Sequence, residues 1–331
     1  PTYYLLLIVN GFNMTNFTEP ITTDLTQTQG SANSINTFFR WLVGLAAFSV
    51  VIVLIWLALT VFNDARPAIN KFGLGFLTND QWDVGKQLFG GLSFVYGTLV
   101  TSFLSLLLAI PLGLAVALTT SENFVPDWLR NPIGFMVELI AAIPSVIVGL
   151  WGIFALIPVI KPLQEWLHAN LGMLPFFSTE PLGPSIFIAG ILLAIMILPT
   201  IAAISRDVLT TVPTELRSAS MALGATRWET IWRTLLPAAS SGIIGGIILA
   251  LGRALGETMA VTMVIGNSTI ISPSILAPGY SIPAALANQF AEAFEELHIG
   301  ALMYLALVLF LITLVVNSIA AVMVQYINRN R

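Results

Sequence analysis

The sequence contains no cysteine and few charged residues. Because none of the 331 residues is cysteine, disulfides, thiolate nucleophiles and cysteine-ligated metals are excluded. Charged residues make up 9% of the chain, compared with roughly 25% in soluble domains. Hydrophobic residues make up 56%, and the mean hydropathy is +0.89. This composition excludes a soluble enzyme, a nucleic-acid-binding protein and a disordered scaffold, and it predicts an integral membrane protein.

The common motifs of metal and nucleotide chemistry are also missing. The two histidines, His168 and His298, lie far apart in the sequence, so we expect no metal site and no cofactor. The net charge of −4 is too mild to indicate an acidic or basic partner. No Gly-x-x-x-x-Gly-Lys-[Ser/Thr] loop is present, so any ATP hydrolysis must take place on a separate subunit. The absence of HExxH and Gly-x-Ser-x-Gly further argues against an intramembrane enzyme, and we expect no enzymatic activity.

Long apolar runs predict the fold class. A membrane-spanning helix needs roughly 20 largely apolar residues. The second apolar run, 87–121, is long enough for a span and an amphipathic surface segment, with a break at Gly90–Gly91. We therefore predict an all-α, polytopic membrane protein with six transmembrane helices, at about 38–62, 93–118, 134–160, 184–204, 238–266 and 299–326.

The basic residues predict the orientation of these helices. Cytoplasmic loops of membrane proteins are enriched in Lys and Arg. With both termini in the cytoplasm, the outer side holds four basic residues, Arg66, Lys71, Lys86 and Lys161. The cytoplasmic side then holds eight, namely Arg40, Arg130, Arg206, Arg217, Arg227, Arg233, Arg329 and Arg331. Arg253 lies within a helix. The sequence thus predicts a multi-pass protein with both termini inside.

The predicted helices divide the chain into four regions. These are a polar N-terminal tail at 1–35, a first transmembrane helix and outer loop at 36–92, a core at 93–326, and a C-terminal tail at 327–331. Tyr3 to Val9 is apolar but too short for a secretory signal peptide, and it lacks a basic flank. Met14 is a candidate start of the chain.

The cytoplasmic segment 213–237 has the pattern of two short helices joined by a corner. Gly224 stands where the end of a helix favours a left-handed residue. Thr226 and Glu229 have the spacing of a capping box, which predicts a second helix. Apolar residues Trp228, Ile231, Trp232 and Leu235 on that helix would face the membrane, and Leu216, Met221 and Leu223 would form an outer apolar edge. The segment is either a docking element for a partner or an ordinary amphipathic surface loop.

This segment resembles the coupling loop of permease subunits in bacterial ABC importers. The family pattern is Glu-Ala-Ala, three residues, Gly, nine residues, then Ile-x-Leu-Pro. Ala219, Gly224, Leu236 and Pro237 match it. Ser218, Ser220 and Thr234 depart from it, and Ser218 lacks the carboxylate of the pattern, although Glu215 lies one turn earlier. The resemblance implies that residues of this loop contact the ATPase, namely Glu215, Arg217, Ser218, Ala219, Gly224 and Ala225.

Three other runs narrow the resemblance to the PstC family, the permease subunits of phosphate-specific importers. These are Gly252 to Val261 with the following Ile265-Gly-Asn267, Ile143 to Trp151, and Ala284 to Glu292. The resemblance covers most of residues 36–326 and implies the type I importer permease fold in a bacterial inner membrane. It also implies four kinds of partner: a second, PstA-like permease; a PstB-like cytoplasmic ATPase dimer; a PstS-like extracytoplasmic phosphate-binding protein; and inorganic phosphate.

Arg253 and Glu257 are charges within the predicted fifth helix, four residues apart and so on one face of it. An arginine at the centre of a membrane-spanning helix costs roughly 2.5–3.5 kcal/mol on insertion scales, so it normally faces a cavity or a partner. The pair is either a self-neutralising structural ion pair or part of a path on which the guanidinium binds a tetrahedral oxyanion. The resemblance favours the second interpretation and implies a substrate path at Arg253, Glu257 and Thr258.

Two weaker patterns leave alternatives open. The stripe Thr98, Thr101, Ser102 and Ser105 either lines a polar path or bonds back to the carbonyls of its own helix. Gly242-x-x-x-Gly246 and Gly252-x-x-x-Gly256 are spacings that allow helices to approach closely.

The predicted function is that of a permease subunit of an ATP-driven phosphate importer. It would form the translocation path by alternating access and couple to the ATPase through 213–237. The alternatives are a permease for another oxyanion, such as molybdate or sulfate, and an ion-coupled secondary transporter that needs no ATPase.

Overall fold

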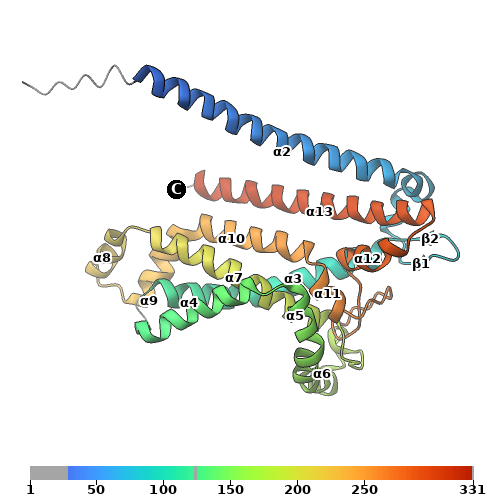
Figure 1. The fold of residues 1–331 in the computed structure, drawn as a ribbon. Coiled ribbons are helices and arrows are strands. Elements are labelled where there is room, and N and C mark those ends of the chain that lie inside the picture. The colour runs from blue at the N-terminus through green and yellow to red at the C-terminus, as the bar shows by residue number, and fades with distance from the viewer. Residues whose placement is uncertain (1–28, 123–124, 330–331) are drawn as a thin grey trace, which may run out of the picture. The chain divides into compact units, whose positions relative to one another are not determined.

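The computed structural model describes residues 29–122 and 125–329 (Figure 1). The chain forms two compact units, Pro1–Ala58 and Leu59–Arg331. Most of the predicted tail at 1–35, with Met14 and the apolar stretch from Tyr3 to Val9, lies outside the described residues. Residues 29–35 already belong to the first described helix.

That helix, α2 (Gln29–Phe72), contains the boundary between the two units. It extends beyond both ends of the predicted helix at 38–62 and continues through Pro67. Within the first unit, every side chain from 36 to 57 is exposed, and most of these side chains are apolar. A mean hydropathy of 2.8 in its most apolar window identifies this helix as a candidate membrane span.

Four further long helices belong to the second unit. They are α3 (Leu92–Ser121), α7 (Ile186–Thr211), α10 (Leu236–Gly256) and α13 (Glu296–Arg329). Together with α2 and the segment 145–171, they make six helical segments that are long and apolar enough to cross a membrane, among the described residues. This confirms the predicted all-α fold with six spans. The cytoplasmic location of both termini stays a prediction.

The third predicted span, 134–160, is wrong as a continuous helix. The structure divides this region into α4 (Asp127–Ala142), α5 (Ser145–Trp151), a π-helical turn (Gly152–Leu156) and α6 (Ile157–Leu171). Ile143 adopts an extended backbone with φ −72° and ψ 128°, as favoured for a residue that precedes proline. Pro144 has no N–H to continue the helical ladder. Figure 1 shows α6 turning away from the direction of α4 and α7.

The centre of the second unit is the pair α3 and α7. Buried side chains account for 67% of the most apolar window of α7. A Cβ added to Gly190 would lie 2.5 Å from Leu104, and one added to Gly113 would lie 2.9 Å from Ile201. The two helices therefore pack closely because each contributes a glycine opposite an aliphatic side chain of the other.

The hydroxyl stripe of α3 belongs to this packed interior. Thr98, Thr101, Ser102 and Ser105 are each no more than 2% exposed. Thr98 donates to Phe94 O, Thr101 to Gly97 O, and Ser105 to Ser102 O, all at 2.7–2.8 Å. For Thr98, Thr101 and Ser105 the interpretation in which the hydroxyls bond back to their own helix is confirmed, whereas the buried Ser102 hydroxyl has no hydrogen-bond partner among the described residues. Because all four side chains are buried within the chain, the stripe does not line an open path along α3.

The predicted break at Gly90–Gly91 is confirmed, because α3 begins at Leu92 with Gly91 at its N-cap. Before it, a hairpin pairs β1 (Trp82–Asp83) with β2 (Leu88–Phe89) in antiparallel fashion, with Trp82 opposite Phe89. Trp82 and Phe89 pack with Phe94 and His298 in an aromatic cluster. The other elements of this end are α12 (Ile282–Gln289) and three short 3₁₀ helices, Gly73–Leu77, Pro175–Phe177 and Phe290–Glu292.

Candidate functional site

The segment 213–237 folds as the predicted two-helix corner. Its first helix is α8 (Thr214–Ala222), and Gly224 follows with φ +90°, a conformation that glycine adopts without a steric penalty. Its second helix, α9 (Arg227–Thr230), begins with the expected capping box. Glu229 N–H donates to the Thr226 hydroxyl over 3.2 Å, and the Glu229 carboxylate accepts from Thr226 N–H over 2.9 Å. A π-helical turn (Ile231–Leu235) then leads into α10.

The second helix of the corner has two unlike faces. Ile231 and Leu235 are 2% and 1% exposed and belong to a core cluster with residues of α3 and α7. Trp228 and Trp232 are more than half exposed and contact each other edge to face. Of the four apolar residues predicted to face the membrane, two therefore pack inside the chain. They follow the helical period, which brings Ile231 and Leu235 to the same side.

The first helix of the corner has no buried residue. Glu215, Ser218, Ala219 and Gly224 are exposed, and Ala225 is half-buried. The predicted apolar edge is also exposed, with Leu223 at 90%. This surface is open to a partner that lies outside the chain.

Arg217 differs from the other residues predicted to contact the ATPase, because its guanidinium is directed into its own chain. Arg217 Nη2 lies 2.8 Å from a carboxylate oxygen of Glu122 and donates to Leu209 O over 2.9 Å. Sequence reasoning missed Glu122, which directly follows α3 and carries no local signal of this contact.

The predicted fifth helix, 238–266, is wrong as a single helix. Helix α10 ends at Gly256, and α11 (Met259–Val264) is a separate short helix. Glu257 between them has φ −69° and ψ 124°, which is extended backbone. Gly256 lowers the helix propensity at this point, and the Glu257 carboxylate accepts from Ala260 N–H, in the first turn of α11, over 3.4 Å. Thr258 donates from its hydroxyl to Gly256 O over 3.1 Å.

This break separates Arg253 from Glu257. They do not share a face of one helix, and no ion pair joins them in the part of the chain that the structure describes. Arg253 is exposed in the last turn of α10, while its neighbours Ala254 and Leu255 are 4% and 2% exposed. The guanidinium therefore projects away from the packed interior of its own chain.

The two glycine pairs of α10 lie on different faces. A Cβ on Gly242 would lie 2.5 Å from Val208, and one on Gly246 would lie 2.9 Å from Ile204, so this pair packs against α7. A Cβ on Gly252 or Gly256 would have no atom of this chain within 4 Å. The second pair therefore lies, like Arg253, on a face that this chain leaves open.

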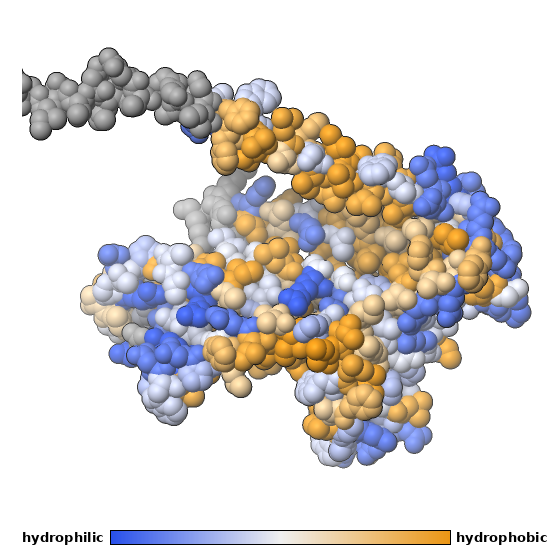
Figure 2. All heavy atoms as spheres, viewed as in Figure 1, coloured by the Kyte–Doolittle hydropathy of each residue, from blue (hydrophilic) through white to orange (hydrophobic). Residues whose placement is uncertain are grey.

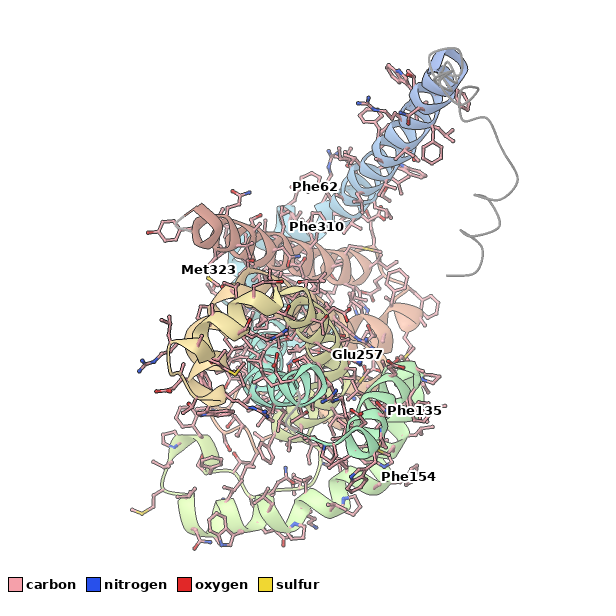
Figure 3. All side chains as sticks on the ribbon, turned by 90° about the vertical axis from the view of Figure 1, so that its left-hand side faces the viewer. Phe62, Phe135, Phe154, Glu257, Phe310 and Met323 are labelled. Atoms are coloured by element: carbon pink, nitrogen blue, oxygen red, sulfur yellow. The ribbon has the colours of Figure 1, made fainter. Side chains whose placement is uncertain are left out.

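Figure 2 shows hydrophilic residues among hydrophobic ones in the middle of the face turned to the viewer. In the end-on view of Figure 3, Glu257 lies between Phe310 of α13 and Phe135 of α4, both of which are exposed. We call the exposed residues Leu249, Arg253 and Gly256, with Gly252 beside them, the open face of α10.

Helix α11 is held against α5 by glycines. A Cβ on Gly149 would lie 2.6 Å from Met263 Sδ and 3.0 Å from Ala260 Cα, and one on Gly152 would lie 2.8 Å from Val264. These contacts explain physically why glycine stands in the run from Ile143 to Trp151. The break after α10 is thereby anchored to a second element.

The opposite end of the molecule presents exposed apolar residues on loops that are fastened by hydrogen bonds. Leu74, Leu182, Ile270 and Phe294 are each at least 76% exposed. In the hairpin, the backbone N–H and ammonium of Lys86 hold the pKa of Asp83 below its usual value. Ile275 N–H donates to Phe176 O, and the Tyr96 hydroxyl donates to Ser272 O. These bonds hold the loop that precedes α7 to the loop between α11 and α12, and hold the latter loop to α3.

Residues 109–331 match the family of binding-protein-dependent transport system inner membrane components. The chain belongs to this family. It is accordingly a multi-pass inner-membrane protein and a transport component without catalytic activity of its own. The matched residues include both the two-helix corner at 213–237, called the coupling corner below, and the open face of α10. It contradicts the alternative of an ion-coupled secondary transporter, because members of this family depend on a binding protein.

Curated relatives match nearly the full chain. The phosphate transport system permease protein PstC of Xylella fastidiosa strain Temecula1 is 43% identical over 88% of this chain and 91% of its own length. PstC of Pasteurella multocida is 41% identical over 92% of this chain and 97% of its own length. PstC of Haemophilus influenzae is 39% identical over 90% and 95%.

Solved structures support the fold. The inward-facing MetNI methionine ABC transporter aligns with a TM-score of 0.50 and 16% identity, covering 72% of this chain and 94% of that chain. A bacterial ABC transporter involved in the import of the acidic polysaccharide alginate aligns with a TM-score of 0.50 and 19% identity, covering 88% and 98%. The chain therefore has the fold of an ABC importer permease.

Proposed function

We propose that this chain is the permease subunit of an ATP-driven phosphate importer. Its relatives that bear the name of a phosphate transport system permease reach 39–43% identity over about nine tenths of the chain. The observation that carries the assignment of a path is the exposed guanidinium of Arg253 in an otherwise apolar helix. An uncompensated arginine in a membrane span is stable only against a cavity or a partner.

The open face of α10 supplies what a tetrahedral oxyanion needs. The guanidinium is planar and always charged, and it binds paired oxygens of phosphate in a fork geometry. Glycines at 252 and 256 leave space beside it. Glu257 and Thr258 follow directly after the last turn of α10, where they would add a carboxylate and a hydroxyl to the end of the path. We assign the substrate path to Arg253, Glu257 and Thr258.

Transport requires partners on both sides of the membrane. A second, PstA-like permease would cover the open face of α10 and complete the path. A PstB-like ATPase dimer would dock on the exposed surface of α8 and Leu223, and its closure would move the corner at 213–237. A PstS-like phosphate-binding protein would dock on the outer loops that carry Leu74, Leu182, Ile270 and Phe294. Alternating access then follows from ATP-driven movement of α8 relative to the membrane.

The test is uptake of labelled phosphate by cells that lack their own high-affinity importer and express this chain with its neighbouring subunits. Arg253→Gln is expected to lower uptake at least tenfold, because the amide cannot replace the charge of the guanidinium. Excess sulfate or molybdate is expected not to compete. The matched control is Arg66→Gln, which removes an exposed arginine from α2.

Three outcomes contradict parts of the proposal. Normal uptake by Arg253→Gln at normal membrane levels would reduce Arg253 to a structural residue. Competition by sulfate or molybdate would reassign the substrate to another oxyanion. Absence of phosphate uptake by the wild-type transporter would reject phosphate and leave the family assignment in place.

A further inference from the structure

The contact between Arg217 and Glu122 is unlike the other ion pairs of the described residues. Lys86–Asp83, Arg130–Asp127 and Lys161–Glu165 join residues three or four apart at 3.2–3.9 Å, and each includes a side chain at least 41% exposed. Arg217 and Glu122 are 95 positions apart, lie 2.8 Å from each other, and have side chains only 21% and 15% exposed. Short, partly buried ion pairs of this kind hold two segments in one geometry, whereas exposed pairs are screened by water.

Arg217 joins α8 to the ends of two long helices. Glu122 is the residue that follows α3, and Leu209, whose carbonyl accepts from the same guanidinium, is in the last turn of α7. The last carbonyls of a helix lack their usual partner four residues on, and Lys, Arg and His side chains can bond to them. Leu209 O accepts from Val212 N–H over 3.4 Å as well as from Arg217. Leu209 is fully buried, so this carbonyl is firmly placed in the core.

Glu122 is itself held from a third direction. Arg130 in the first turns of α4 donates to Glu122 O over 3.2 Å. The backbone of Glu122 is thus fixed by α4 while its carboxylate is bound by α8. The contact between Arg217 and Glu122 therefore connects the end of α3 with α4, α7 and α8.

Helix α8 depends on such polar contacts because it has no buried side chain of its own. A helix of nine residues is marginal in water without tertiary packing. Its other side-chain hydrogen bonds to neighbouring elements, among the described residues, are made by Ser220, whose hydroxyl lies 3.0 Å from that of Thr230 in α9 and accepts from Thr234 over 3.4 Å. Arg217 is therefore the direct connection from α8 to α3 and α7, the central pair of the core.

We propose that Arg217 and Glu122 form a strut that carries movement of the coupling corner to α3 and α7. Arg217 is then a positioning residue inside the permease and not a contact with the ATPase. This proposal rests on the proposed function, in which an ATPase docks on α8. With the strut intact, a displacement of α8 displaces the ends of both helices. With the strut broken, α8 moves alone and ATP hydrolysis is uncoupled from transport.

The test uses the complete transporter reconstituted in lipid vesicles with its ATPase subunits and phosphate-loaded binding protein. Glu122→Gln and Arg217→Gln are each expected to lower phosphate transported per ATP hydrolysed about tenfold, while the basal ATPase rate and co-purification of the ATPase stay at the wild-type level. The double variant is expected to be no worse than either single one, because both substitutions remove the same interaction. Arg217→Lys is expected to recover part of the coupling, since it keeps the charge.

The matched control is Glu165→Gln, which removes the carboxylate of the exposed Lys161–Glu165 ion pair and is expected to leave coupling unchanged. Additive losses in the double variant would overturn the strut, because they would show two independent roles. Loss of ATPase binding in Arg217→Gln but not in Glu122→Gln would also overturn it and return Arg217 to the ATPase surface.

A second readout does not depend on the substrate. Because the chain has no cysteine, Leu249→Cys introduces a single reactive thiol on the open face of α10. ATP is expected to change its rate of modification by a maleimide, and Glu122→Gln is expected to abolish that change while hydrolysis continues. If wild type transports no phosphate but shows the ATP-dependent change, the substrate assignment fails and the strut remains. If Glu122→Gln keeps the change, the strut fails whatever the substrate is.

Discussion

The hydroxyl of Thr234 lies 3.4 Å from the hydroxyl of Ser220 and donates to it. Both residues depart from the coupling-loop pattern, which has isoleucine and alanine at these places. The two departures therefore contact each other, and Ser220 also lies 3.0 Å from the Thr230 hydroxyl. A small polar network takes the place of an apolar contact between α8 and the turn that leads into α10.

This network predicts non-additive effects of substitution. Ser220→Ala is expected to destabilise the purified transporter by about 1 kcal/mol, because Thr230 and Thr234 lose a hydrogen-bond partner. Adding Thr234→Ile is expected to recover part of the loss by restoring an apolar pair. Thermal unfolding measures both variants. The control is Ser218→Ala, whose exposed hydroxyl bonds only to its own helix, at Thr214 O and Glu215 O. Purely additive losses would show that the two positions are independent.

The capping box predicts how firmly the corner is held. Thr226→Ala is expected to weaken α9 by about 1 kcal/mol, because Glu229 N–H loses its acceptor. Amide hydrogen exchange at residues 228–230 is expected to become several-fold faster. Thr226→Ser keeps the hydroxyl and is expected to exchange like wild type. Equal exchange in the alanine variant would mean that tertiary packing alone maintains this turn.

The two faces of α10 predict opposite effects of filling a glycine. Gly246→Leu is expected to destabilise the chain itself, because even a Cβ would lie 2.9 Å from Ile204. A Cβ on Gly252 would have no atom of this chain within 4 Å, so Gly252→Leu is expected to leave folding intact but to reduce co-purification of the second permease. Folding is measured by gel filtration in detergent, as the fraction of the protein that elutes as a monomer. Normal association of Gly252→Leu would show that the partner does not cover this face.

The close packing of α11 against α5 at Gly149 limits the size of the side chain that position 149 can hold. Gly149→Ala is expected to cost less than Gly149→Val, since Met263 can move by rotation and only a shift of a few tenths of an ångström is needed at Ala260. Gly149→Val is expected to destabilise the transporter by about 1–3 kcal/mol, because the branched side chain would collide with the backbone at Ala260, 3.0 Å from the first added carbon. The melting temperatures of the two variants check this. Similar values would mean that α11 shifts freely.

Substitution of Glu257 is expected to reduce transport without changing the stability of the transporter. Glu257→Gln keeps an oxygen that can accept from Ala260 N–H, so the thermal stability of the transporter is expected to be unchanged. Phosphate uptake is expected to fall several-fold, because the carboxylate charge beside the path is lost. Uptake at the wild-type level would limit Glu257 to its hydrogen bond with α11.

Local features were predictable from the sequence because the interacting groups are neighbours in the chain. The capping box of Thr226 and Glu229, the left-handed Gly224 and the break before Leu92 each depend on a few consecutive residues. The apolar runs predicted the number of spans, since hydropathy responds to the membrane and not to other helices. Pro144 indicates a kink in its apolar run, because proline cannot donate to the helical ladder, and the structure has a full break there. The break at Glu257 was missed because it lies inside a long apolar run, where composition does not distinguish one helix from two.

The sequence by itself determined that this chain is an all-α membrane protein with six spans, a two-helix cytoplasmic corner and an arginine within an apolar helix. Only the tertiary structure decided where those groups point. It brought Glu122 to Arg217 across 95 positions, buried the hydroxyls of α3, and left Arg253 on an open face. The physical reason is that hydropathy depends on one continuous run of roughly 20 residues and capping on a single turn, so both are local in the sequence. The direction of a side chain depends instead on which glycine or carbonyl of a distant helix lies opposite it.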